Sequence, residues 1–269
     1  MAEFHIVVCG SLVPDPLQTL EPVTGPDGQP ALKNENMLPA VLDPWAGHAL
    51  FEAADLASRN EGSKVWLVSL GPKARLQQLM MTVAQKVPFE LVAIDGSASG
   101  FTDPMETAAA LAAGIESIDG LDRSKLLLFG GCASATRSAG VTLQVVGELL
   151  GLTEQFLQVD ELTVTEAGQL RILERIEGGQ YQVSVCSGTP AVLAWATGHL
   201  PEPPNNPQVG MANMRAVMPA LQKASPATVG ADGVTYVSVE LPTQQRDTKI
   251  VQDVSPGEIA RELAEWIKG

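Results

Sequence analysis

Short apolar runs alternate with helical patterns along the first 150 residues, and this alternation limits the fold more than any other feature. The runs cover residues 4–9, 64–71, 89–94 and 126–131, and each has the length of one buried strand. Strands that are separated by helices form parallel sheets with helices on both faces. The sequence therefore predicts an α/β protein with a mostly parallel, doubly wound sheet.

Helix signals stand between these runs. One helix is predicted after the LDPW segment at 42–45, and a second begins at Pro72. The second helix repeats apolar residues at the spacing of one helical face, at Leu76, Leu79, Met80 and Val83. A third has the pattern of a capping box, with Asp103 as N-cap, Pro104 at N1 and Glu106 at N3.

The segment 126–151, LLLFGGCASATRSAGVTLQVVGELLG, combines a strand, a glycine turn and a helix start. Gly130 and Gly131 end the apolar run, and small hydroxyl residues follow before the next helical pattern. Backbone N–H groups and the helix dipole meet at such a turn, so it favours an anion such as a nucleotide phosphate. A glycine turn with an ordinary Ser/Thr helix cap fits the same residues. Both interpretations stay open at this point.

The pattern changes after residue 154. Segments 157–164, 169–179 and 180–188 have strand composition and are joined by short polar turns, and 191–197 has the pattern of one more buried strand. We interpret this section as an antiparallel extension of the same sheet. Residues 1–198 are therefore predicted to form the nucleotide-binding α/β domain.

Residues 199–269 are predicted to form a second part that lies on a partner. A Pro/Asn-rich linker reaches residue 210, and a Met-rich segment covers 211–224. The tail predicts a helix with Ser255 as N-cap, Pro256 at N1 and Glu258 at N3. Its apolar side needs a surface on which to be buried, and that side consists of Ile259, Leu263, Trp266 and Ile267.

Composition excludes several classes of protein. The formal net charge of −14 argues against a general nucleic-acid or acidic-membrane binder. No apolar run approaches the roughly 18 residues that a membrane span requires. The three cysteines lack C-x-x-C spacing, so no disulfide framework or metal cluster is indicated. Because the N-terminus also lacks the pattern of a signal peptide, we expect a cytoplasmic, bacterial protein.

Catalytic patterns are missing from the sequence. It contains no G-x-S-x-G, Walker A, H-E-x-x-H or G-x-G-x-x-G motif. His5, His48 and His199 share no spacing that suits a metal or a catalytic pair, so structural or solvated roles are favoured. We therefore expect no catalytic residues and no metal. A binding function remains, at the strand ends near 9–11, 70–72 and 130–138.

Five segments in order resemble the beta subunit of electron transfer flavoproteins. They are IVVCGSLVPDP, LDPWAGHALFEAADL, VSLGP, LERIEGG and TPAVLAWATGHLPEP, and the resemblance extends nearly from end to end. It implies a nucleotide-binding α/β subunit that pairs with an alpha subunit and shares its FAD. Such a subunit receives electrons from a flavin dehydrogenase and passes them to a membrane-bound, quinone-linked oxidoreductase. The redox chemistry then belongs to the cofactor.

The resemblance also implies a set of cofactor-binding residues. They would surround AMP, held structurally, or a second FAD as in electron-bifurcating members. Trp45 stands where the family has a Phe that approaches the alpha-subunit flavin. The full set is Cys9, Gly10, Asp43, Pro44, Trp45, Leu70, Gly130, Gly131, Cys132, Ser134, Thr136, Arg137 and Ser138.

The chain departs from the family pattern in two loops. Ser11 and Asp43 replace a Lys and an Asn, and ASATRSA replaces acidic and amide residues in the nucleotide loop. The choice between AMP and a second FAD therefore stays open. In the partner-recognition segment an exposed family leucine is absent, and Met211, Met214 and Met218 are the candidate anchors for the dehydrogenase. Packing of these methionines on the subunit's own sheet is the alternative.

Two other functional classes remain as alternatives. A stand-alone adenine-nucleotide sensor predicts a self-contained C-terminal region, whereas the segment after residue 198 has the pattern of a partner-binding arm. A small-molecule enzyme needs clustered ionisable groups, and the strand ends offer Asp15, Asp43 and Arg137. Both rank below the flavoprotein hypothesis.

Overall fold

The computed structural model divides the chain into two compact units, Met1–Val239 and Glu240–Gly269. Each is described by itself below. The residues that the structure describes are 3–97, 100–135, 140–230, 233–241, 243, 248 and 250–268. The predicted boundary at 198/199 concerns partner binding and stays a prediction.

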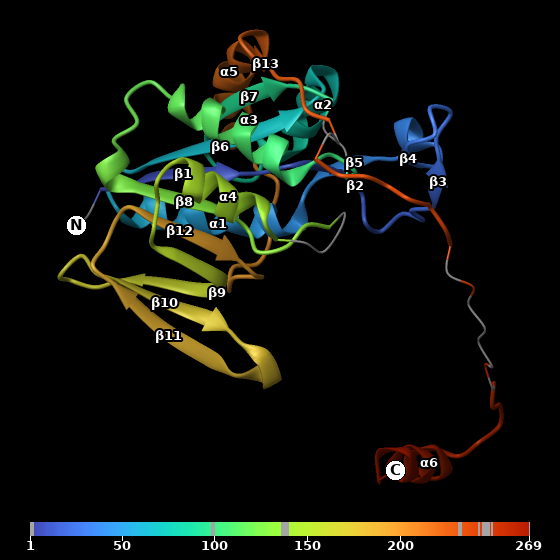
Figure 1. Ribbon diagram of the computed structural model, residues 1–269. Helices are drawn as coiled ribbons and strands as arrows, with labels where there is room; N and C mark the ends of the chain where they lie inside the picture. Colours follow the sequence, from blue (N-terminus) through green and yellow to red (C-terminus); the bar gives the residue numbers. More distant parts are fainter. Residues whose placement is uncertain are drawn as a thin grey trace. The chain divides into compact units, whose positions relative to one another are not determined.

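A nine-stranded sheet forms the centre of the first unit (Figure 1). In spatial order its strands are β11 (Tyr181–Cys186), β10 (Leu170–Arg175), β9 (Gln155–Val164), β12 (Ala191–Trp195), β8 (Leu126–Gly131), β1 (His5–Cys9), β6 (Lys64–Gly71), β7 (Glu90–Asp95) and β13 (Ser225–Pro226). Two small antiparallel pairs stand beside it, β2 (Leu12–Pro14) with β5 (Ala40–Leu42) and β3 (Pro22–Thr24) with β4 (Pro30–Leu32).

Parallel pairing extends from β9 through β12, β8, β1, β6 and β7 to β13. Strand β10 is antiparallel to both of its neighbours, β9 and β11. The predicted fold class, a mostly parallel α/β sheet with an antiparallel extension, is confirmed. Strand β12, which was predicted to belong to the extension, is instead parallel to both of its neighbours. The chain order reverses between β1 and β8, since β6 and β7 follow on one side of β1 and β8 and β12 on the other. Ligands of doubly wound sheets bind at this reversal point.

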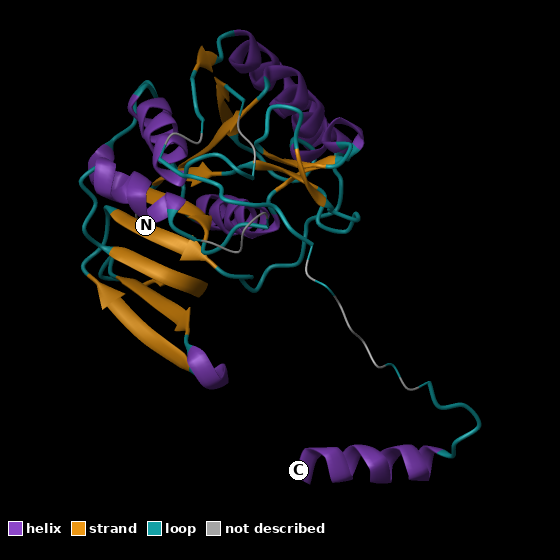
Figure 2. Cartoon of the chain, turned by 45° about the vertical axis from the view of Figure 1, so that its right-hand side comes forward, coloured by secondary structure: helices purple, strands orange, loops and turns teal. Residues whose placement is uncertain are grey.

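Helices cover both faces of the sheet, because successive strand residues point to opposite sides (Figure 2). One core packs α1 (Pro44–Arg59), α2 (Lys73–Val83) and α5 (Pro207–Gln222) against the face that carries Ile6, Leu67 and Phe129. The other packs α3 (Pro104–Glu116) and α4 (Thr142–Leu149) against the face that carries Val7 and Leu128. No helix of the described ranges is long and apolar enough to cross a membrane.

Two local expectations need correction. Helix α5 begins at Pro207, inside the predicted linker, because the Asn206 side chain accepts hydrogen bonds from the N–H groups of Gln208 and Val209. At α3, Asp103 is the N-cap as predicted, but Glu106 does not complete the box. Its Oε2 accepts a 2.6 Å hydrogen bond from the N–H of Gly230 instead. A tertiary hydrogen bond to Gly230 therefore takes the place of the local hydrogen bond of the capping box.

The second unit contains α6 (Pro256–Lys268), and its predicted capping box is confirmed. The backbone N–H of Ser255 donates to Glu258 Oε2 at 3.0 Å, and the N–H of Glu258 donates to Ser255 Oγ at 3.3 Å. The apolar side predicted for this helix is exposed on the unit, with Ile259 48% and Trp266 74% accessible.

Candidate functional site

A cavity of about 100 Å³ lies at the reversal point between β1 and β8. The ends of these two strands and the starts of α1 and α4 supply most of its wall, and α3 adds one side chain. The lining residues are Cys9, Ser11, Asp43, Ala46, Leu111, Gly130, Gly131, Ala133, Ser134, Gly140, Thr142 and Leu143. The cavity is therefore where the fold class places a ligand.

Three glycines of the lining allow the backbone to come close to other atoms. A Cβ on Gly131 would clash with Cβ of Trp45, and a Cβ on Gly140 would clash with the carbonyl oxygen of Cys132. A Cβ on Gly130 would lie 2.9 Å from Cδ1 of Leu143. The glycine turn that the sequence shows is thus a steric requirement, since larger residues would push the loop away from α1 and α4.

Asp43 joins the two loops that border the cavity. Its Oδ1 accepts a hydrogen bond from the N–H of Trp45 at 3.0 Å and thereby caps α1, while Oδ2 accepts from the N–H of Ala135 at 2.9 Å. The residue is 5% exposed. Burial raises the pKa of this carboxyl, and the backbone N–H groups of Ala135, Trp45 and Ala46 oppose that rise. Both oxygens are therefore engaged in holding the loops together.

The two cysteines near the cavity are held as neutral thiols. Burial raises the pKa of Cys9 to about 12. Burial also raises the pKa of Cys132. A hydrogen bond to its own backbone and the charge of Arg175 lower this pKa, and the charges of Asp160 and Asp43 raise it. Thiolates are the nucleophilic form of cysteine, so neither residue is prepared for covalent chemistry.

The structure brings part of the predicted cofactor set together and leaves the rest beside it. Residues of the set that line the cavity are Cys9, Asp43, Gly130, Gly131 and Ser134. Residues next to the lining in the chain are Gly10, Pro44, Trp45 and Cys132, whereas Leu70 is buried in the core below α3. Thr136, Arg137 and Ser138 lie outside the described residues. The assignment of these residues to a cofactor stays a prediction.

Several lining residues escaped the sequence analysis. Gly140 lies just before α4 and Thr142 is its first residue, so their position at a predicted helix start was a usable signal. Leu111 gave no such signal, because it comes from α3 and reaches the cavity only through the packing of α3 beside α4.

The three methionines predicted as partner anchors differ in exposure on α5. Met211 is 64% exposed, whereas Met214 and Met218 are partly buried and pack against the core between α5 and the sheet. Core packing therefore describes two of the three, and the role of Met211, Met214 and Met218 in partner binding stays a prediction.

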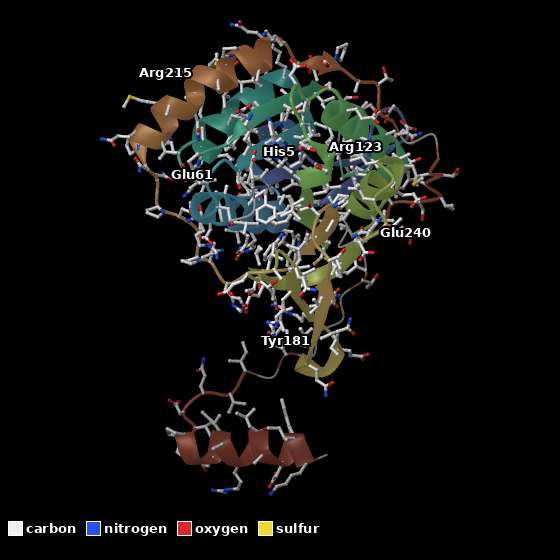
Figure 3. All side chains as sticks on the ribbon, turned by 90° about the vertical axis from the view of Figure 1, so that its left-hand side faces the viewer. His5, Glu61, Arg123, Tyr181, Arg215 and Glu240 are labelled. Atoms are coloured by element: carbon white, nitrogen blue, oxygen red, sulfur yellow. The ribbon has the colours of Figure 1, made fainter. Side chains whose placement is uncertain are left out.

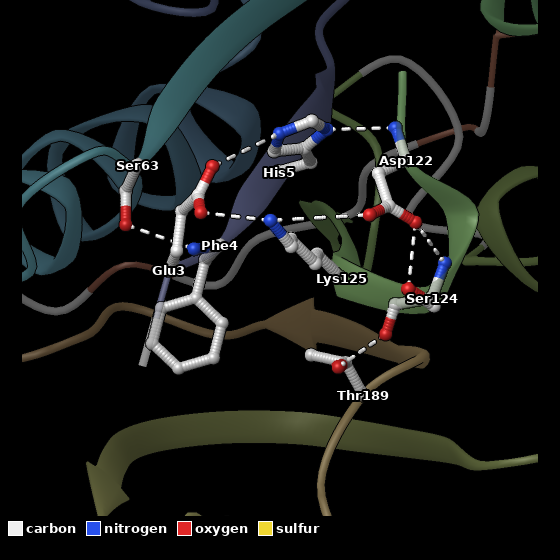
Figure 4. A network of polar contacts seen from close by, with 8 residues as sticks. All are labelled: Glu3, Phe4, His5, Ser63, Asp122, Ser124, Lys125 and Thr189. Carbon is white, nitrogen blue, oxygen red and sulfur yellow. Dashed lines mark hydrogen bonds and ion pairs between the residues drawn. The ribbon is translucent and has the colours of Figure 1, made fainter. Parts of the chain in front are cut away.

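The histidines occupy separate structural positions. His5 is 5% exposed, and its Nδ1 accepts a 2.8 Å hydrogen bond from the N–H of Asp122 at the opposite end of the sheet from the cavity (Figure 4). His199 Nε2 lies 3.6 Å from Glu161 Oε2, and His48 is partly buried on α1. Among the described residues, no three His, Cys, Asp or Glu side chains gather closely enough to hold a metal ion.

Fold and cavity together define a doubly wound α/β protein with a glycine-lined cavity at the strand ends. Comparison with known proteins is consistent with this class. A family model described as "electron transfer flavoprotein domain" matches residues 34–238. The chain therefore belongs to the electron transfer flavoprotein domain family, which is associated with flavin.

One curated relative is the caffeyl-CoA reductase-Etf complex subunit CarD of Acetobacterium woodii. It is 30% identical to this chain over 146 residues, which are 54% of this chain and 52% of CarD. The match thus spans about half the length of that relative.

Proposed function

We propose that this chain is the beta subunit of a heterodimeric electron transfer flavoprotein. It pairs with an alpha subunit, receives electrons from a flavin dehydrogenase and passes them to a membrane-bound, quinone-linked oxidoreductase. The FAD shared with the alpha subunit supplies the redox chemistry. Family membership and the printed role of CarD as a subunit of an Etf complex support this proposal.

We further propose that the cavity holds the phosphate of AMP in a structural role. The single observation that carries this is the glycine-lined turn in front of α4. The N-cap of α4 is Val141, whose side chain cannot accept a hydrogen bond, so this residue does not compete with an anion for the first N–H groups of the helix. Ser134 and Thr142 add hydroxyl groups to the lining.

Asp43 is the one charged residue among the described residues that line the cavity, so its carboxylate has to be accounted for beside a phosphate. Both carboxylate oxygens of Asp43 accept hydrogen bonds from backbone N–H groups. These N–H groups offset part of the negative charge and hold the carboxylate against the protein backbone. In the proposed complex, Asp43 positions the loop that faces the phosphate, and the glycines let the backbone approach it. In this proposal the chain is an electron carrier subunit, and the bound cofactor carries out the redox reaction.

The proposal is tested by co-expressing the chain with an electron transfer flavoprotein alpha subunit and measuring the nucleotides released from the purified complex. We expect one FAD and one AMP per heterodimer. Two FAD and no AMP per heterodimer would indicate that a second FAD, and not AMP, occupies the cavity. A chain that stays alone and carries neither nucleotide would overturn the proposal.

A matched pair of variants locates the nucleotide. Gly131→Ala forces a Cβ against Trp45 and is expected to lower the AMP content while FAD is retained. Gly47→Ala is the control, because a Cβ on Gly47 in α1 meets no atom within 4 Å. Full AMP content in the Gly131→Ala complex would place the nucleotide elsewhere.

A further inference from the structure

His5 is a buried titratable residue that the proposed function does not use. It is the first residue of β1, and 5% of it is exposed. Figure 3 views this end of the sheet, with His5 near the middle of the unit and Glu61 and Arg123 on exposed loops around it. The cavity lies at the other end of β1. His5 is therefore a titratable position that is separate from the candidate site.

The hydrogen bond between His5 and the backbone shows which ring nitrogen carries the proton. Nδ1 accepts from the N–H of Asp122 at 2.8 Å (Figure 4). A ring nitrogen that accepts a hydrogen bond has no proton of its own, so the neutral ring carries its proton on Nε2. Nε2 lies 3.7 Å from Glu3 Oε1. The geometry therefore fits a neutral His5 with one defined tautomer.

The N–H of Asp122 belongs to a turn that leads into β8. Arg123–Lys125 form a short 3₁₀ helix directly before this strand. Asp122 caps it, because its Oδ1 accepts from the N–H of Ser124 at 3.0 Å and from the hydroxyl of Ser124 at 2.6 Å. The carbonyl oxygen of Ser124 accepts from Thr189 Oγ1, just before β12. The bond to the His5 ring thus connects β1 to the turns before β8 and β12.

Charged groups of two segments lie close to the ring. Glu3 precedes β1, and its Oε2 accepts from Lys125 Nζ at 2.7 Å. The hydrogen bond and the charge of Lys125 lower the pKa of Glu3, so Glu3 stays a carboxylate in mild acid. Hydrogen bonds from Ser124 lower the pKa of Asp122 in the same way. A charged imidazole would therefore meet two carboxylates and one ammonium group.

Strands β6 and β7 add two charges behind an aromatic ring. Trp66 on β6 packs edge-on against His5, with the ring centres 5.3 Å apart. Lys64 Nζ lies 5.9 Å from the centre of the Trp66 ring, and Glu90 Oε2 on β7 accepts from Trp66 Nε1 at 3.2 Å. The indole stands between these two opposite charges and the imidazole. Glu3 and the turn before β8 are therefore the parts that respond directly to protonation of the ring.

Protonation of the ring removes one of its contacts and strengthens another. An imidazolium has a proton on both nitrogens and is a donor only, so Nδ1 can no longer accept from the N–H of Asp122. Two N–H groups then face each other, and the backbone N–H is left without its acceptor. On the other side of the ring, Nε2–H and the Glu3 carboxylate become an ion pair. Histidine side chains change charge between about pH 5 and 8, so this exchange of partners occurs near neutral pH.

We propose that His5 is a pH-dependent switch, whose neutral form holds the turn at 122–125 against β1 and whose protonated form releases this turn and pairs with Glu3. The hydrogen bond is present while the ring is neutral, and it is lost as pH falls and the ring takes up a proton. Acidification then loosens the segment that leads into β8 and, through Ser124, the turn before β12. The switch is independent of the proposed flavoprotein function, since none of its residues lines the cavity.

The first test is hydrogen exchange of the full wild-type chain, followed by NMR at about pH 8 and about pH 5. We expect the protection factor of the Asp122 amide, which corrects for the intrinsic effect of pH on exchange, to fall about tenfold on acidification. The amide of Val7, in the middle of β1, should keep its protection. Equal protection of Asp122 at both pH values would overturn the proposal. Ring ¹⁵N shifts that place the proton of neutral His5 on Nδ1 would also overturn it.

Variants separate the switch from a purely structural role. His5→Asn keeps an acceptor, because its amide oxygen can replace Nδ1, and it does not titrate. The Asp122 protection factor should then be the same at both pH values. Glu3→Gln removes the ion-pair partner, so the fall should occur at lower pH than in wild type. His199→Asn is the matched control, since the His199 side chain is 60% exposed and lies outside these contacts, and it should keep the wild-type profile.

Two results with these variants would contradict the proposal. A fall in the Asp122 protection factor that persists in His5→Asn would assign the effect to another group. Loss of the fall in His199→Asn would assign it to His199. The wild-type measurement decides the proposal by itself if His5→Asn does not fold.

Discussion

The carboxylate of Asp43 accepts a hydrogen bond from the N–H of Ala135 at 2.9 Å, across 92 residues of sequence. The same side chain caps α1 through the N–H of Trp45. A single buried carboxylate therefore fixes the start of one helix and the loop that precedes another. Asp43 also lines the cavity between these segments.

Replacement of Asp43 tests that relationship. We expect Asp43→Ala to lower the free energy of unfolding by about 2–3 kcal/mol, because two backbone N–H groups lose their acceptor and one of them is a helix cap. Asp43→Asn should cost about 1 kcal/mol, since its amide oxygen can keep one of the two bonds. Urea unfolding followed by circular dichroism measures both values. Equal, negligible losses would show that the two loops are held by other contacts.

Because Asp160 and Arg175 form an ion pair, we expect that the effects of substituting them on the free energy of unfolding are not additive. Asp160 is 1% exposed, and Arg175 binds both of its oxygens. Arg175→Met leaves a buried carboxylate without its partner and should cost about 2–4 kcal/mol of unfolding free energy. Adding Asp160→Asn to that variant should recover part of the loss, which a double-mutant cycle measures. Strict additivity would contradict a direct coupling.

Glu52 predicts a pH dependence of stability. Its Oε1 accepts hydrogen bonds from the N–H groups of His199 and Leu200, and burial raises its pKa from 4.5. The folded state therefore holds the proton more tightly than the unfolded state does. The stabilisation that this raised pKa gives to the folded state is fully present below pH 4.5. It is lost as pH rises through the raised pKa, and above that pKa the free energy of unfolding no longer changes because of Glu52.

The test compares wild type with Glu52→Gln, which does not titrate. The difference between their unfolding free energies should change only in that window and should shift in favour of Glu52→Gln as pH rises. Urea unfolding from about pH 4 to about pH 8 covers it. A difference that is flat over the whole range would show that the pKa of Glu52 is the same in both states.

The thiol of Cys9, which lines the cavity, is expected to react slowly. With a pKa of about 12, only about one Cys9 in ten thousand is a thiolate at pH 8. Cys9 in the folded chain should therefore react with a disulfide reagent such as DTNB about a thousandfold more slowly than in urea. Cys9→Ser assigns the slow phase, which should disappear in that variant. Fast labelling of Cys9 in the folded state would show that the thiol is accessible and ionised.

The parallel part of the fold was predictable from the sequence, and the reason is local. Runs such as 65–68 and 126–131 are apolar throughout, which is typical of short strands that are buried on both faces. Helix α5 was missed although Asn206 and Pro207 have the N-cap and N1 pattern. The prolines around it favoured a linker, and its contact with α2 outweighs them: the buried Asn213 side chain donates to the carbonyl oxygens of Ala84 and Val87.

The sequence by itself determined the α/β class, the order of the main elements and the glycine turn at 130–131, because these follow from periodicity and from residues with special backbone freedom. Only the tertiary structure decided which of these segments meet. Leu111 reaches the cavity, and the apolar side of β11 is exposed at the edge of the sheet. Glu106 accepts a hydrogen bond from the N–H of Gly230 and does not complete the capping box of α3. Such contacts join residues far apart in the chain, and local patterns do not specify them.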